Sequence, residues 1–303
     1  MNQLHVAVLM GGPSAEREIS RKTGAAAARA LRAAGLCVRV VDVAGAQFEL
    51  PRETEVVFLA LHGTFGEDGQ IQRILELHGM PYTGSDAEAS ERAFDKALAK
   101  EIFCAAGVPT PPYVVVERDV RPLAGMKPPL VVKPARQGSS YGVSIVTDPA
   151  QLDRAIDQAW RYDQKLLVEQ RIEGREFTVG ILDGAALPVV EIVPHRGFFD
   201  FEAKYQGESD EIVPARIDSV TTRRIQEVAL RAHESLGCRD YSRVDVMLDG
   251  DGNLFVLEVN TLPGLTEQSL LPKAARAAGI GMEELCSRLV EMALQRRAEA
   301  VTA

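Results

Sequence analysis

The chain has 303 residues, 46% of them hydrophobic and 25% charged, which is ordinary for a soluble globular protein and enough for about two or three domains. Its net charge of −9 argues against nucleic acid or an anionic membrane surface as the main partner, and no apolar run is long enough to span a bilayer. The four cysteines form no Cys-x-x-Cys pair, so we expect reduced thiols in a cytoplasmic protein rather than a zinc or redox site.

The first part of the chain predicts an open parallel α/β sheet. An apolar run ending in a Gly-Gly pair, an Ala-rich helical stretch and two further apolar runs follow one another at residues 4–10, 15–34, 37–43 and 55–61. Ligands of such sheets usually bind beyond the carboxyl ends of the strands. Glu16 follows the first strand, and His62 follows the third on a Gly-rich loop with Glu67 and Asp68. We therefore expect a binding edge there, although an acidic residue in a first helical turn is also typical of helix capping.

A domain boundary is expected near Ser85, where the pattern changes. The elements predicted beyond it are helices at 87–91 and 94–106, strands at 129–134 and 143–146, a helix at 149–161 and a strand at 165–172. A Gly/Ser-rich loop at 135–142 joins the first two of these strands, and Lys133 stands at the end of the first.

The Gly/Ser-rich loop matches the Gly-x-Ser-x-Gly pattern of a hydrolase nucleophile elbow at residues 138–142. An elbow must lead into a helix, whereas the β-branched residues that follow here predict a strand. Backbone N–H groups of such a loop can instead cover phosphates. No Walker A sequence is present, because Gly-Lys-Ser/Thr does not occur in the chain.

The last part of the chain predicts antiparallel strands, a lid and further helices. Strands at 176–182 and 186–193 flank a turn at Asp183-Gly184, and a helix is expected at 218–236. Residues 195–213 between them are polar and without steady period, and a loop of that length is typical of a functional lid.

Residues 241–264 predict a β-hairpin with a two-residue turn at Asp251-Gly252. Counting outward from that turn pairs Val246 with Leu257, and Asp245 with Glu258. Period-two alternation then predicts one apolar face and one mixed face, the latter made of Arg243, Asp245, Met247, Val256, Glu258 and Asn260.

Facing carboxylates repel each other, and a divalent cation between Asp245 and Glu258 would remove the repulsion. Asn260 adds a neutral oxygen, and oxygen ligands suit Mg²⁺ or Mn²⁺ rather than zinc. The plainer alternative is a solvated hairpin face, against which the apolar residues on that face argue. A calcium loop starting at Asp249 is excluded, because its required Gly and Glu are replaced by Leu254 and Asn260.

Together these features suit a nucleoside triphosphate bound with metal ions and without a P-loop. Lys133 and Lys96 are candidate phosphate ligands, and Arg243 is placed to stabilise negative charge that develops beside the metal. No Ser/His/Asp or Cys/His nucleophile system is apparent, so phosphate chemistry by positioning and electrostatics is expected.

Seven short segments stand in a specific order and spacing: GGPSAERE, LHGTFGEDG, FDK, VVKPARQGSSYGVS, FEAKY, SRVDVML and LEVNTLPGLTEQSLLPKAA. Through these segments the chain resembles D-alanine–D-alanine ligases of the ATP-grasp superfamily over nearly its whole length. The resemblance implies an N-terminal α/β substrate-binding domain (1–84), a central ATP-grasp subdomain (85–170) and a C-terminal ATP-grasp subdomain with the lid (171–303). It also implies joining of two D-alanines through a D-alanyl phosphate, with release of ADP and phosphate, for peptidoglycan precursors, and it suggests a homodimer.

Site roles are carried over from this resemblance motif by motif. For ATP, it implies phosphate contacts from Lys96 and Lys133, adenine contacts from Glu169 and Ile172, and ribose contacts from Glu176. Two Mg²⁺ or Mn²⁺ ions would be held by Asp245, Glu258 and Asn260. The first D-alanine would be held by Glu16, through hydrogen bonds to Ser139 and Tyr205, and by His62. Arg243 and the Gly264 N–H would stabilise the oxyanion. Ser269 and Leu270 would bind the carboxylate of the second D-alanine, and Lys204 would contact the transferring phosphoryl group.

Two alternatives stay open at this stage. One is a related ligase that joins D-alanine to a hydroxy acid as an ester, against which Tyr205 argues because relatives that favour the ester carry another residue there. The other is an ATP-sensing module without catalysis, against which Glu16 and Arg243 argue. Gln170 and Phe199 depart from the family pattern, where Lys and Tyr are frequent, and this affects the expected adenine contact and lid closure.

Overall fold

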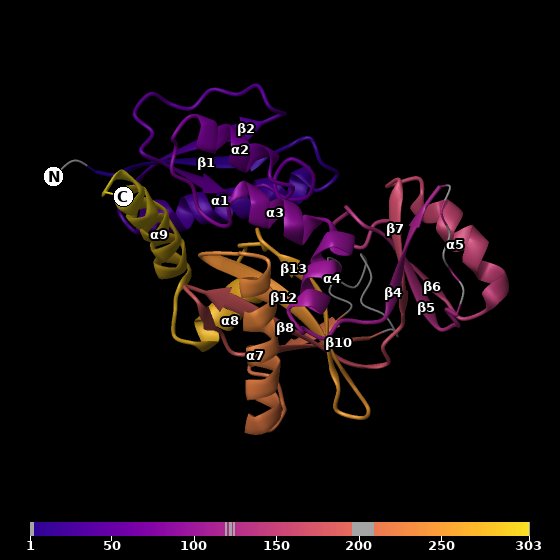
Figure 1. Cartoon of the computed structure of the whole chain (residues 1–303). Coiled ribbons are helices and arrows are strands. Elements are labelled where there is room, and N and C mark those ends of the chain that lie inside the picture. The colour runs from indigo at the N-terminus through magenta and orange to yellow at the C-terminus, as the bar shows by residue number, and fades with distance from the viewer. Residues whose placement is uncertain (1–2, 119, 121–122, 124, 196–208, 303) are drawn as a thin grey trace.

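The computed structural model describes residues 3–118, 120, 123, 125–195 and 209–302, and the chain forms three separate sheets with helices packed around them (Figure 1). The predicted lid residues 196–208, which include Phe199, Lys204 and Tyr205, lie outside this description. Among the described residues, no helix is long and apolar enough to cross a membrane.

The N-terminal sheet is parallel, as predicted, with the strand order β2-β1-β3. Its elements are β1 (His5–Gly11), α1 (Arg17–Ala33), β2 (Cys37–Val43), β3 (Val56–Leu59) and α2 (Gln70–Leu77). The apolar run of β1 is buried because α1 covers it, and Gly24 of α1 allows the close approach, since a Cβ there would lie 2.6 Å from the Cβ of Met10. The C-terminal helix α9 (Met282–Thr302) returns to pack against α1 and β3 (Figure 1).

The central sheet is antiparallel, with the order β4-β7-β5-β6. It comprises β4 (Tyr113–Glu117), β5 (Leu130–Pro134), β6 (Ser144–Val146) and β7 (Lys165–Gln170), covered by η1 (Pro149–Gln151) and α5 (Leu152–Ala159). Two helices precede it, α3 (Ala87–Phe94) and α4 (Lys96–Ala105), and Asp95 caps α4 by accepting from the N–H groups of Ala97 and Leu98. The Gly/Ser loop lies between two paired strands, so the sequence-based rejection of a nucleophile elbow is confirmed.

The C-terminal sheet has the order β11-β10-β8-β12-β13, with β9 added beside β8. Its strands are β8 (Gly174–Leu182), β9 (Ala185–Ala186), β10 (Val190–Pro194), β11 (Ser209–Ile212), β12 (Tyr241–Asp249) and β13 (Leu254–Asn260). The turn at Asp183-Gly184 is confirmed, and both residues have the positive φ that such a tight turn requires. Residues 209–212 were expected in the lid but pair with β10 as β11, which corrects the extent of that segment.

Helices α4 and α7 (Ser219–Ser235) cover one face of the C-terminal sheet. The core there joins Phe103 of α4 and Ile225 of α7 with Val244, Val246 and Val256 of the hairpin. Helix α8 (Leu270–Ala277) packs against β8. Because side chains alternate along a strand, the neighbours of these valines point to the opposite face of the sheet.

The hairpin of β12 and β13 corrects the predicted register in part. Asp245 lies opposite Glu258, as predicted, but the register shifts by one residue beyond this pair, so Val246 lies opposite Val256 rather than Leu257. The predicted two-residue turn is also wrong, because the Asp249 side chain accepts the N–H groups of Asp251 and Asn253 and so stabilises a longer loop. A β-bulge at Leu257 compensates for this turn, and it places Val256 in the core, not on the carboxylate face.

Candidate functional site

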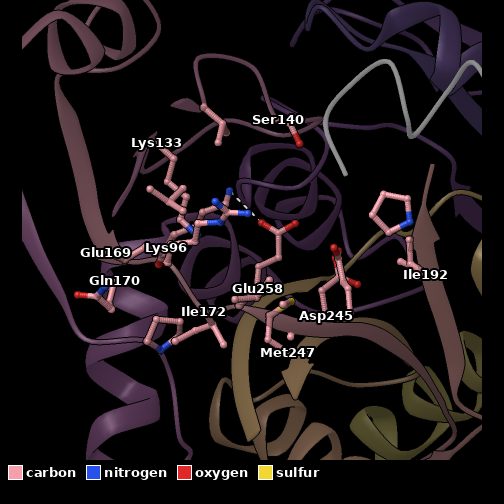
Figure 2. A pocket seen from close by; sticks show the side chains of 18 of the residues that line it. Lys96, Lys133, Ser140, Glu169, Gln170, Ile172, Ile192, Asp245, Met247 and Glu258 are labelled. Atoms are coloured by element: carbon pink, nitrogen blue, oxygen red, sulfur yellow. Dashed lines mark ion pairs between the residues drawn. The ribbon is translucent and has the colours of Figure 1, made fainter. Parts of the chain in front are cut away.

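A cavity of about 390 Å³ lies between the central and C-terminal sheets, within the roughly 300–1,000 Å³ typical of small-molecule pockets. One wall comes from β5, β7 and the Gly/Ser loop, and the other comes from β8, β10, β12 and β13. Figure 2 shows Lys96, Lys133 and Glu169 on one side of this cavity, and Asp245, Met247 and Glu258 on the other. The structure therefore brings together residues that are far apart in the sequence and that were predicted to share a site.

The two predicted phosphate ligands both line the cavity. Lys133 lies at the end of β5, with its Nζ 2.6 Å from a carboxylate oxygen of Glu169. Lys96 is the first residue of α4, directly after the capping Asp95, and its Nζ donates to the carbonyl of Gln137 at 2.7 Å and lies 3.4 Å from Glu258. Lys96 therefore bridges the Gly/Ser loop and the carboxylate wall.

Glu169 is buried between two lysines. Besides Lys133, its carboxylate pairs with Lys100 of α4 at 3.0 Å. Burial alone would raise the pKa of Glu169, but the two ammonium groups outweigh it and hold the pKa below its usual value. The Glu169 carboxylate is engaged in these two ion pairs, and its backbone lies in the central strand β7 between β4 and β5. The sequence did not lead us to Lys100. It could have been found as a charged residue on the apolar face of α4, near Phe103.

Apolar side chains form much of the cavity lining. They come from several strands and the β7–β8 connection, and are Val131, Ile172, Ile192, Met247 and Leu257. Glu176 of β8 also lines the cavity. The Gln170 side-chain amide donates to the carbonyl of Pro129 at 2.8 Å, so this N–H group braces the cavity wall.

Asp245 and Glu258 form the carboxylate pair of the opposite wall. Asp245 is 5% exposed and accepts a hydrogen bond from Thr178 of β8 at 2.6 Å. Arg243 binds it through Nε and Nη2, both at 3.1 Å, and the amide of Asn260 donates to it at 3.4 Å. These donors offset the repulsion between the carboxylates that the register creates.

The donor set of this wall fits Mg²⁺ or Mn²⁺ in chemistry. Asp245 and Glu258 supply carboxylate oxygens, and Asn260 supplies a neutral oxygen once its amide is turned. Among the described residues, no group of three His, Cys, Asp or Glu side chains is placed to hold a metal ion. A metal here would therefore depend on Asn260 and on oxygens of a bound ligand, which is the usual arrangement for Mg²⁺ on a nucleotide.

Glu16 and Ser139 connect the N-terminal sheet to the Gly/Ser loop. The Ser139 hydroxyl donates to the Glu16 carboxylate, and a Cβ at Gly63 or Gly138 would lie only 2.4 or 2.6 Å from it. Burial raises the pKa of Glu16, and the nearby Glu67 raises it further, against the opposing effects of Ser139, His62 and Lys96. The Glu16 side chain does not cap α1, and its carboxylate is buried at the junction with the Gly/Ser loop.

His62 lies in the same region and is 6% exposed. Its Nε2 is 2.9 Å from the Thr23 hydroxyl, and its Nδ1 is 3.7 Å from a carboxylate oxygen of Glu67. The structure thus places His62 near Glu16, as the sequence predicted for the edge of this sheet.

The remaining predicted residues follow β13. Ser269 precedes α8, and its hydroxyl accepts the N–H of Thr266 at 3.1 Å. A Cβ at Gly264 would lie 2.9 Å from the Ser269 hydroxyl, so a larger residue there would have to displace that hydroxyl. Leu270 begins α8, where backbone N–H groups are suited to an anion. Lys204 and Tyr205 are not among the described residues.

Comparisons with known proteins point to one family. A family model described as D-ala D-ala ligase C-terminus matches residues 102–291, and one described as D-ala D-ala ligase N-terminus matches residues 42–85. The chain is 50% identical to a D-alanine–D-alanine ligase of Methylacidiphilum infernorum over 96% of each chain, and 46% identical to one of Citrifermentans bemidjiense over 95% of each.

Solved structures give the same result for the fold. The Bacillus anthracis D-alanine–D-alanine ligase complexed with ATP superimposes with a TM-score of 0.88 at 34% identity, covering 99% of this chain and 100% of that chain. The enzyme of Coxiella burnetii superimposes with a TM-score of 0.89 at 26% identity, covering 100% of this chain and 97% of that chain.

Proposed function

The chain belongs to the D-alanine–D-alanine ligase family, and on that premise we propose that it joins two D-alanines into D-alanyl-D-alanine at the expense of ATP. The observation that carries the proposal is the position of the lysine wall opposite the carboxylate wall, with Glu16 at the adjoining loop. This arrangement supports a site for a polyphosphate and its counter-ions in the cavity, with a carboxylate for an ammonium group beside the loop that lines it.

ATP would occupy the cavity between the sheets, with its base among the apolar side chains and its phosphates toward Lys96 and Lys133. Glu169 and Ile172 would meet the adenine, and Glu176 the ribose. Asp245, Glu258 and Asn260 would hold two Mg²⁺ or Mn²⁺ ions, whose chemistry is to neutralise charge on the transferring phosphoryl group. The ATP complex of the Bacillus anthracis relative supports a nucleotide as the ligand of this fold.

The first D-alanine would place its ammonium group at Glu16, held by Ser139 and Tyr205, and its carboxylate near His62. An ammonium in contact with Glu16 would favour the ionised carboxylate, which burial and Glu67 otherwise disfavour. The enclosed position of Glu16 keeps water from competing for this pair, which strengthens it.

The chemistry would proceed by two displacements. A carboxylate oxygen of the first D-alanine attacks the γ-phosphorus of ATP, and the bond to the ADP oxygen breaks to give D-alanyl phosphate. The amine of the second D-alanine attacks the acyl carbon after losing a proton, and the carbon–oxygen bond to phosphate then breaks. Arg243 and the Gly264 N–H would hold the oxyanion, Ser269 and Leu270 the second carboxylate, and Lys204 the phosphoryl group.

The proposal extends to the assembly and the location of the protein. The division of the chain at residues 84 and 170, a homodimer and a cytoplasmic location for peptidoglycan precursor synthesis are supported by the family resemblance. Light scattering on a size-exclusion column tests the dimer directly, and a monomer at working concentration would contradict that part alone.

The decisive assay follows ADP release with D-alanine as the only amino acid and identifies the product by mass spectrometry. The expected product is D-alanyl-D-alanine, formed in step with ADP. A product with D-lactate but none with D-alanine would instead indicate the ester-forming ligase. ATP binding without any turnover would leave only the nucleotide-sensing alternative.

A further inference from the structure

Lys100 is a buried cation for which the proposed reaction has assigned no role. Its side chain is 0% exposed, and burial lowers its pKa. Removing an ammonium group from water is strongly unfavourable unless partners compensate for it. A lysine in such a position is therefore expected to serve the groups that surround it.

The surroundings of Lys100 fix its ammonium group in one place. Its Nζ donates to the Thr110 hydroxyl at 2.5 Å and lies 5.3 Å from the ring centre of Tyr113. Thr110 in turn donates to the carbonyl of Val256 at 2.8 Å, and the Val256 N–H binds the carbonyl of Pro109. Lys100 is thus tied to β13, just before the bulge that turns Leu257 and Glu258 toward the cavity.

The charges around Glu169 explain why a second lysine matters. One carboxylate stands between two ammonium groups, at 2.6 Å from Lys133 and 3.0 Å from Lys100. With Lys133 alone, Glu169 would neutralise the lysine that faces the cavity, and an incoming phosphate would have to compete with it. Because Lys100 shares the Glu169 carboxylate, the three side chains Lys100, Glu169 and Lys133 together keep a net positive charge at the cavity wall.

We propose that Lys100 is a positioning residue for the nucleotide, which acts through Glu169 to hold Lys133 in place and to leave its charge available to the polyphosphate. The inference rests on the proposed function in that the ligand is ATP or ADP. It does not require ligation, because it concerns nucleotide binding alone.

The test measures the Kd of ADP with Mg²⁺ by isothermal titration calorimetry on the full chain. Lys100→Met should raise the Kd of ADP roughly tenfold, because the positive charge of the Lys100 ammonium is lost and Glu169 then neutralises Lys133 alone. Lys100→Arg keeps the charge and should recover much of the affinity. A matched control is Arg296→Met, which removes a partly buried cation from the buried Asp240 away from the cavity and should lower thermal stability without changing the Kd.

A double-mutant cycle with Lys133→Met separates positioning from general destabilisation. If Lys100 acts through Lys133, the double variant should bind ADP about as weakly as Lys133→Met alone. Additive losses, or an unchanged Kd in Lys100→Met, would overturn the inference. If Lys100→Met does not fold, Thr110→Val carries the test, since loosening the anchor of Lys100 should weaken ADP binding in the same direction, and an unchanged Kd there refutes it.

These results are distinguishable from failure of the proposed function. Normal ADP binding without formation of dipeptide in the unsubstituted protein would remove the ligase assignment and leave the role of Lys100 to be decided by the cycle. Absence of ADP binding in the unsubstituted protein would overturn both.

Discussion

Replacing Glu16 by Gln separates the function of this carboxylate from its effect on stability. Glu16 is 9% exposed and accepts a hydrogen bond from Ser139, and Gln keeps the shape and an acceptor oxygen while it removes the charge. A hydrogen bond to a charged group contributes about 1.5–3 kcal/mol, so the KM for the first D-alanine should rise roughly 10- to 150-fold.

The same substitution should not destabilise the ligand-free protein. Burial and Glu67 raise the pKa of Glu16, so its ionised form is disfavoured in the folded chain and this cost grows as the pH rises. Glu16→Gln should therefore be at least as stable as the original at pH 7. Glu18→Gln is the control, because Glu18 is an exposed carboxylate on the same helix and forms an ion pair with Arg21 on the surface.

The assay combines steady-state kinetics in D-alanine with thermal unfolding without ligand. A normal KM in Glu16→Gln would refute the ammonium contact. A loss of activity that is matched by an equal loss of stability would show that Glu16 serves folding and would refute the reasoning from its pKa.

Three further substitutions test the site, the burial of His233 and the packing around Gly174. Arg243→Ala should lower kcat by about 10²–10³, or about 2.7–4 kcal/mol, if Arg243 donates to the oxyanion, and unchanged turnover would remove that role. Burial lowers the pKa of His233 from 6.5 to about 4, so the protein should lose about 3 kcal/mol of stability as the pH falls through that window. Urea unfolding of His233→Asn should show a correspondingly weaker pH dependence, and an identical one would contradict the prediction. Gly174→Ala would place a Cβ 2.0 Å from the Leu248 carbonyl oxygen and should cost about 1–3 kcal/mol, whereas Gly250→Ala, with no atom within 4 Å, should be neutral; equal stabilities would contradict the packing.

The pair of Asp245 and Glu258 shows how much of the site could be predicted from the sequence. Alternation along the hairpin predicted that Asp245 faces Glu258, and this is confirmed. Strict alternation predicts one register throughout the hairpin, whereas the loop at Asp249 and the bulge at Leu257 each shift the register by one residue, in opposite senses. A bulge leaves no clear pattern in a short apolar run, so the positions of Val256 and Leu257 were exchanged.

The parallel N-terminal sheet and the Gly/Ser loop between strands were predictable for a different reason. Apolar runs punctuated by glycine are local signals, and each strand could be read without knowledge of its partners. The pair of Lys100 with Glu169, and the hydrogen bond from Thr178 to Asp245, join residues that are 69 and 67 positions apart. Such contacts depend on how helices and sheets pack, which local patterns do not encode.

The most direct test of an acyl phosphate intermediate follows oxygen from D-alanine labelled with ¹⁸O in its carboxylate. Attack of that carboxylate on the γ-phosphorus transfers an oxygen to phosphate, and cleavage of the carbon–oxygen bond by the second amine leaves it there. An acyl phosphate intermediate should therefore put ¹⁸O into the inorganic phosphate in step with the D-alanyl-D-alanine formed. Phosphate without the label, released alongside the dipeptide, would contradict an acyl phosphate at this site.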